Sequence, residues 1–80
     1  MDPTDVERLI ESGVPDADAE VTRARGADDD DHLAAVVVSP AFEDLPLLEQ
    51  HEMVYDALGD HMTTDIHALE LTTKTPTEVE

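Results

Sequence analysis

The spacing of apolar residues along the chain predicts a first helix close to the N-terminus. Asp2 suits the N-cap and Pro3 the first helical position, because a proline has no N–H to satisfy there. Apolar residues then recur at i, i+3 and i+4, as along one face of a helix: Val6, Leu9 and Ile10. Gly13 is a stop signal, so the predicted helix is short and has one narrow apolar edge.

Two predicted strands come next. Residues 19–25, AEVTRAR, hold few apolar side chains, and we expect them at or near the edge of a sheet. Residues 32–39, HLAAVVVS, are apolar at successive positions, which is typical of a central strand. The intervening aspartates 28–31 predict a solvated hairpin loop, because an EF-hand calcium loop needs acids at alternate positions, a central glycine and a closing glutamate.

A longer helix is predicted from residue 47. Its apolar stripe falls at i, i+4, i+7 and i+11 and consists of Leu47, His51, Val54 and Leu58. His51 is therefore expected to face the interior, with Leu48 and Tyr55 flanking the stripe. In the connection before this helix, residues 39–46, Phe42 is expected to cap the core.

The residues that follow this helix predict a break and then a third strand. Gly59 and Asp60 form a stop signal, and residues 63–65 continue the break. From there, strand alternation places His67, Leu69, Leu71 and Thr73 on one face and Ile66, Ala68, Glu70 and Thr72 on the other. A helix start at Thr75 and Pro76 is followed by too few residues for a mature helix, so we expect a frayed tail.

The predicted elements follow one another in the order α, β, β, α, β. This order indicates an α+β sandwich. The first two strands form an antiparallel hairpin, the third returns beside them by way of the long helix to give a three-stranded mixed sheet, and both helices cover one face. We expect residues 1–80 to form a single domain, too small for a large enclosed active site.

The formal net charge is −17, from 21 acidic and 4 basic residues. Such a charge is common in disordered chains, but the periodic apolar segments favour a folded protein. Repulsion destabilises a compact state unless ions screen it, and at about 1 M salt the Debye length falls to roughly 3 Å. We therefore hypothesise a halophilic protein from a high-salt cytoplasm, and we expect little unaided nucleic-acid binding, which relies on Lys and Arg.

The chain contains no cysteine. It therefore offers no disulfide, thiolate nucleophile or Cys-based zinc site, and a soft metal needs thiolates from a partner. The absence of a signal peptide and of a long apolar run predicts a cytoplasmic protein without membrane association. No Ser-His-Asp spacing, phosphate-binding glycine loop or paired carboxylates are evident, so we do not expect an enzyme.

Several segments together resemble one known family. The VVVS strand followed by Phe42, the helical His51 within QHEMVYDAL, the segment IHALEL and the sequence TPTE resemble the BolA family over residues 32–78. The resemblance implies a class II KH-like fold and a partnership with monothiol glutaredoxins, in which the two proteins share a [2Fe-2S] cluster. We expect this chain to bind no cofactor alone. It also implies a second interpretation, a DNA-binding transcriptional regulator.

The resemblance gives roles to three histidines. His32 and His67 match the two characteristic ligand positions of the family, and His51 matches its helical histidine. Imidazole ligates iron, and it raises the cluster potential in Rieske-type sites. The alternative for His67 is a polar residue at a strand end, and for His32 a solvated imidazole or one paired with an aspartate. We expect His51 to be a hydrogen-bonded core histidine and His61, which matches no role, to lie at the surface.

Other positions depart from the family pattern. The glycine usual two residues after the phenylalanine is Asp44, the basic residues that flank the helical histidine are Gln50 and Glu52, and the aromatic residue often found after TPTE is Val79. The loss of the basic flanks weighs against DNA contact, as does the absence of a GxxG loop. A weak homodimer remains an open alternative.

Overall fold

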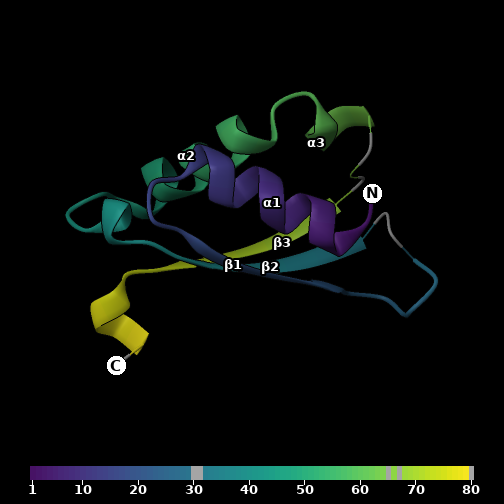
Figure 1. Cartoon of the computed structure of the whole chain (residues 1–80), viewed down its shortest axis with the longest axis horizontal. Helices are drawn as coiled ribbons and strands as arrows, with labels where there is room; N and C mark the ends of the chain where they lie inside the picture. The colour runs from purple at the N-terminus through teal and green to yellow at the C-terminus, as the bar shows by residue number, and fades with distance from the viewer. Residues whose placement is uncertain (30–31, 65, 67, 80) are drawn as a thin grey trace.

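The computed structural model describes residues 1–29, 32–64, 66 and 68–79, and Figure 1 shows helices layered on a sheet. In chain order the elements are α1 (Pro3–Gly13), β1 (Asp18–Arg23), β2 (His32–Val38), the 3-10 helix η1 (Pro40–Phe42), α2 (Leu47–Leu58), α3 (His61–Thr64), β3 (Ala68–Lys74) and the 3-10 helix η2 (Pro76–Val79). The predicted αββαβ order is confirmed. The short helix α3 lies in the segment for which the sequence predicts only a break.

The sheet has three strands in the order β1-β2-β3 and is mixed. β1 and β2 pair antiparallel, with Arg23 opposite Leu33. β2 and β3 pair parallel, with His32 opposite Ala68. A parallel neighbour needs a crossover connection, and α2 lies within it. The central place of β2 and the edge place of β1 agree with the predictions from their apolar content.

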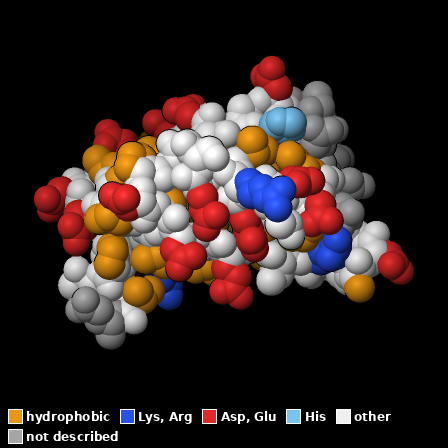
Figure 2. Space-filling view, in the orientation of Figure 1, with side chains coloured by type: hydrophobic (Ala, Val, Ile, Leu, Met, Phe, Trp, Pro, Cys, Tyr) orange, Lys and Arg blue, Asp and Glu red, His pale blue; other side chains and the backbone are white. Residues whose placement is uncertain are grey.

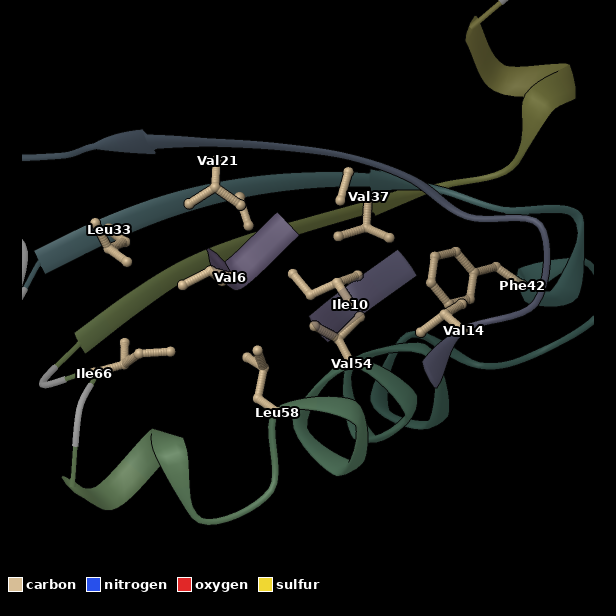
Figure 3. Close-up of a cluster of buried hydrophobic side chains, with 12 residues drawn as sticks. Val6, Ile10, Val14, Val21, Leu33, Val37, Phe42, Val54, Leu58 and Ile66 are labelled. Carbon is tan, nitrogen blue, oxygen red and sulfur yellow. The ribbon is translucent and has the colours of Figure 1, made fainter. Parts of the chain in front are cut away.

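The hydrophobic core lies between the sheet and the helices α1 and α2, which cover the same face (Figures 1 and 3). Its buried apolar residues are Val6, Ile10, Val14, Ala19, Val21, Leu33, Ala35, Val37, Phe42, Val54, Leu58 and Ile66. Phe42 is fully buried and closes the end of the core next to η1, as predicted. The other face of the sheet carries exposed side chains, among them Glu20, Val36 and Glu70.

Helix α1 is fixed at both of its ends. Asp2 is the N-cap, and its Oδ1 accepts a hydrogen bond from the backbone N of Thr4 at 2.9 Å, as predicted. Gly13, the last residue of α1, packs so closely on α2 that a Cβ at this position would lie 2.4 Å from the Cβ of Ala57. Gly13 is therefore needed for helix packing, while the helix ends at the extended C-cap Val14, whose backbone N donates to the carbonyl oxygen of Ile10.

The apolar stripe predicted for α2 is only half correct. Val54 and Leu58 are fully buried, but Leu47 and Leu48 are 61% and 71% exposed. His51 is half-buried. At about 100° per residue Leu47 lies between Val54 and Leu58 around the helix axis, so it is exposed because of its place in the first turn of α2, which contributes little to the core.

The alternation predicted for the third strand is confirmed within β3 but fails before it. Ile66 is 1% exposed, although the alternation groups it with the exposed Ala68 and Glu70. The reason is that β3 begins only at Ala68, so the two-residue period does not extend back to Ile66.

The expectation of a frayed tail is wrong for the residues of η2. The backbone N and Oγ1 of Thr75 both donate to Oε1 of Glu78, at 3.0 and 3.1 Å. Thr77 Oγ1 donates to Oε1 of Glu43 at 3.2 Å. These bonds order a single turn that extends away from the sheet (Figure 1).

Candidate functional site

The histidine that begins β2 lies at one end of the sheet, next to the start of β3. Because the two strands are parallel, both begin at the same end, and His32 is opposite Ala68. Ala68 follows His67 in the sequence, and His67 itself lies outside the described residues. The structure therefore places His32, while the assignment of His67 stays a prediction.

Asp29 holds His32 through both its main chain and its ring. Asp29 Oδ1 accepts from the backbone N of His32 at 3.2 Å, and Oδ2 lies 2.9 Å from the ring Nδ1. An ionised carboxylate only accepts hydrogen bonds, so Nδ1 carries the proton, and in the neutral ring the lone pair resides on Nε2. The side chains of His32 and Asp29 are 25% and 31% exposed, so the carboxylate orients a ring that is partly exposed.

Pairing with an aspartate is thus the alternative that the structure selects for His32. The partner, Asp29, comes from the aspartate run that the sequence predicts to be only a solvated loop. The sequence signal for this pairing is that Asp29 precedes His32 by three residues, because aspartates at turns commonly accept hydrogen bonds from nearby backbone N–H groups. A carboxylate on one ring nitrogen is also the usual partner of a histidine that binds metal through the other, so the pairing is compatible with ligation.

His51 lies in a different part of the molecule. Its ring meets that of Tyr55 edge-on, with centroids 6.4 Å apart and planes at 87°. The preceding residue, Gln50, bonds to Thr73 near the C-terminal end of β3. His51 is therefore not brought together with His32, and it is a half-buried aromatic neighbour rather than a fully buried core histidine.

The described residues do not form a complete metal site by themselves. Within residues 1–29, 32–64, 66 and 68–79, no group of three or more His, Asp or Glu side chains is placed to hold a metal ion. His61, which the sequence predicts at the surface, is half-buried in α3. A metal centre at the start of β2 therefore requires ligands beyond those described here.

Gln50 is a structural residue that the sequence did not reveal. Its Nε2 donates to the carbonyl oxygens of Leu45 and Phe42, at 2.9 and 3.3 Å, and its Oε1 accepts from Thr73 Oγ1 at 2.6 Å. In the sequence Gln50 counts only as a lost basic residue. The amide is well suited to this position because it donates at one end and accepts at the other, which Lys and Arg do not.

Basic side chains are scattered over the described surface. Arg8 is on α1, Arg23 ends β1, Arg25 follows in the hairpin connection and Lys74 ends β3. Figure 2 shows one face of the molecule, on which acidic side chains are spread widely. This arrangement does not provide the continuous basic surface that phosphate binding requires. None of the described helices is both long and apolar enough to cross a membrane.

These features define a small α+β domain whose mixed sheet presents a carboxylate-held histidine at one end. The chain belongs to the BolA family, because the family model described as "BolA-like protein" matches residues 14–78. The BolA family is not enzymatic. The resemblance and the absence of an enzyme inferred from the sequence are thereby confirmed.

Two curated relatives and one solved structure illustrate the similarity. "Protein BOLA1, chloroplastic" of Arabidopsis thaliana is 39% identical over 51 residues, which cover 64% of this chain and 32% of that protein. "SufE-like protein 1, chloroplastic/mitochondrial" of the same plant is 34% identical over 79 residues, 99% of this chain and 21% of that protein. The chain thus spans a third or less of these relatives. A structure of a bolA protein homologue from Coxiella burnetii is 43% identical with a TM-score of 0.79, covering 99% of this chain and 96% of that one.

Proposed function

We propose that this chain is an adaptor that binds a monothiol glutaredoxin and shares a [2Fe-2S] cluster with it, for iron–sulfur trafficking or for redox or iron regulation. His67 and His32 are its ligands, and the partner supplies the sulfur ligands. The observation that carries the proposal is the Asp29-held imidazole of His32 at the end of the sheet where β3 begins. Membership of the BolA family supports it.

The donor set fits a shared cluster better than one bound by this chain alone. The chain has no cysteine, and the described residues contain no group of three ligand side chains. Histidine replaces thiolate on one iron of Rieske-type clusters, so a centre with imidazole from one protein and thiolate from the other is chemically sound. Asp29 on Nδ1 makes Nε2 of His32 the ligating atom in this proposal.

The setting of this adaptor follows from its charge. In our proposal residues 1–80 act as one domain in a cytoplasm of high salt, where ions screen the net charge of −17. The same charge and the scattered arginines give no support to DNA binding as the main activity. His51, packed on Tyr55, has a structural role in this scheme.

The proposal is tested by anaerobic titration of the protein into a cluster-loaded monothiol glutaredoxin in molar KCl, followed by visible circular dichroism. We expect a new cluster spectrum that saturates near one to one. His67→Ala is expected to abolish it and His32→Ala to alter it, because each removes a nitrogen ligand. Asp29→Asn is expected to change the spectrum less, since an amide still accepts a hydrogen bond from Nδ1 but without the charge.

His61→Ala is the matched control, because it removes a half-buried histidine that the proposal does not use. An unchanged spectrum on adding wild-type protein refutes cluster sharing with that partner. A normal spectrum for both His67→Ala and His32→Ala refutes the ligand assignment while leaving the partnership intact. In the first case a DNA-binding screen at matched salt becomes the next experiment.

A further inference from the structure

The two edges of the sheet are treated differently by the rest of the molecule. At the β1 edge, two glutamates of α1 take the outward backbone N–H groups: Glu7 Oε2 accepts from Val21 at 2.9 Å, and Glu11 Oε2 accepts from Ala19 at 3.1 Å. An edge strand whose donors are occupied in this way cannot pair with a further strand at those positions. The β1 edge is therefore closed by the chain itself.

The β3 edge is open in the part of the chain that the structure describes. β3 pairs only with β2, and the carbonyl of Lys74 accepts from the backbone N of Ser39, which lies on the β2 side. Because backbone groups alternate along a strand, those of Leu69, Leu71 and Thr73 point to the outer side. Seven residues of backbone, roughly 20 Å, are available there for pairing.

An apolar helix face stands next to this open edge. α1 contacts α2 at Ala57, and α2 is anchored over β3 by the Gln50–Thr73 hydrogen bond. At about 100° per residue, Leu48 and Tyr55 lie roughly 160° to 180° around α2 from Ala57, on the side away from α1. Both side chains are exposed. The outer side of α2 therefore presents an exposed apolar surface, made by Leu48 and Tyr55, next to the unpaired edge of β3.

We propose that the β3 edge and the exposed apolar side chains of α2 form a docking site for an extended, basic peptide segment of a partner protein, which adds a fourth strand to the sheet. The apolar side chains are Leu48 and Tyr55. When a peptide binds by adding a strand to a sheet, the main-chain hydrogen bonds supply the affinity and alternate side chains of the peptide supply the specificity.

Charge complementarity selects the occupant. Exposed acids flank the proposed site: Glu49, Glu52 and Asp56 lie on α2, and Glu70 lies on the other face of β3, where it would neighbour a side chain of an added strand. At contact distance, where salt screens least, lysine or arginine side chains pair with these acids, whereas a second copy of this chain brings the same acids to the interface and a nucleic acid brings phosphates. The site goes beyond the proposed function, since Leu48 lies near the C-terminal end of β3, at the far end of the sheet from His32.

The probe is a fluorescent peptide of about eight residues with alternating valine and lysine, which matches the length of β3. Its binding to the full chain is measured by anisotropy at low and at high KCl, and the site is mapped by amide chemical shifts in NMR. We expect shifts at Leu69, Leu71 and Thr73, and we expect Leu48→Ser to weaken binding about tenfold, as for an exposed apolar anchor. A peptide methylated on the backbone nitrogens that face β3 is expected not to bind.

A pair of charge reversals separates docking from general attraction. Glu70→Lys on β3 and Glu20→Lys on β1 change the net charge equally, and both residues are exposed. Docking at β3 requires the first to weaken binding several-fold more than the second. The proposal is overturned if the two charge reversals weaken binding equally, if the amide chemical shifts change at the β1 edge, or if the methylated peptide binds as well as the unmethylated one. Dimerisation that Leu48→Ser abolishes, seen by sedimentation equilibrium, also overturns it, because the occupant is then a second copy.

Discussion

The close contact between α1 and α2 makes Gly13→Ala a sharp test of the packing. The new Cβ would lie 2.4 Å from Ala57 Cβ and 2.9 Å from its Cα. Carbon atoms prefer separations of about 3.5–4.0 Å, so the helices have to move apart by roughly 1 Å. One of the two neighbouring atoms belongs to the backbone, so a side-chain rotation cannot relieve the clash.

The expected cost follows from two opposing effects. Overpacking of a well-filled contact costs about 1–3 kcal/mol, and the backbone neighbour puts this case in the upper half of that range. Alanine has the better helix propensity by up to about 1 kcal/mol, which offsets part of the cost. We therefore expect Gly13→Ala to lower the free energy of unfolding by about 1–2 kcal/mol, a large share of the stability of a small domain.

The measurement is urea denaturation in constant molar KCl, followed by far-UV circular dichroism and analysed by linear extrapolation. Ala57→Gly serves as the partner variant, and the double variant closes a double-mutant cycle. If steric overlap causes the destabilisation, the double variant is more stable, by at least about 1 kcal/mol, than the sum of the two single effects predicts. A Gly13→Ala protein that is as stable as the wild type, or an additive cycle, refutes the assignment of Gly13 to helix packing.

In the same denaturation assay, Gln50→Ala is expected to lower the free energy of unfolding by about 2–3 kcal/mol, because it leaves the buried Thr73 hydroxyl without its acceptor. Glu52→Ala, at an exposed position, is the control and is expected to change the free energy of unfolding little. Asp44→Gly is expected to raise the free energy of unfolding by roughly 0.5 kcal/mol, because Asp44 has a φ of 65°, where a side chain is strained. Asp44→Ala is expected to lower the free energy of unfolding, and equal effects of the two variants refute the strain argument. Raising KCl from about 0.1 to about 1 M is expected to raise the urea midpoint of the wild type, since the Debye length falls from about 10 to about 3 Å, and an unchanged midpoint counts against the halophilic interpretation.

At the candidate site, the local sequence predicts where His32 lies but not which group its ring contacts. The position of His32 at the start of a central strand follows from the apolar run after it, which is typical of a central strand. Its pairing with Asp29 depends on how a run of aspartates turns back towards the strand. Many loop conformations satisfy the same composition, so the sequence leaves a solvated ring and a paired ring both open.

The sequence by itself determined the order of elements, the hairpin, the cap at Asp2 and the burial of Phe42, because each depends on a local period or on a residue with a strong conformational preference. Only the tertiary structure decided how far along α2 burial extends, since the predicted stripe is buried at Val54 and Leu58 but exposed at Leu47, and no local pattern shows where the covering elements end. It also decided that Gly13 is a contact residue. That role arises from the approach of a second helix more than forty positions away in the chain, and no local pattern encodes the distance between two helices.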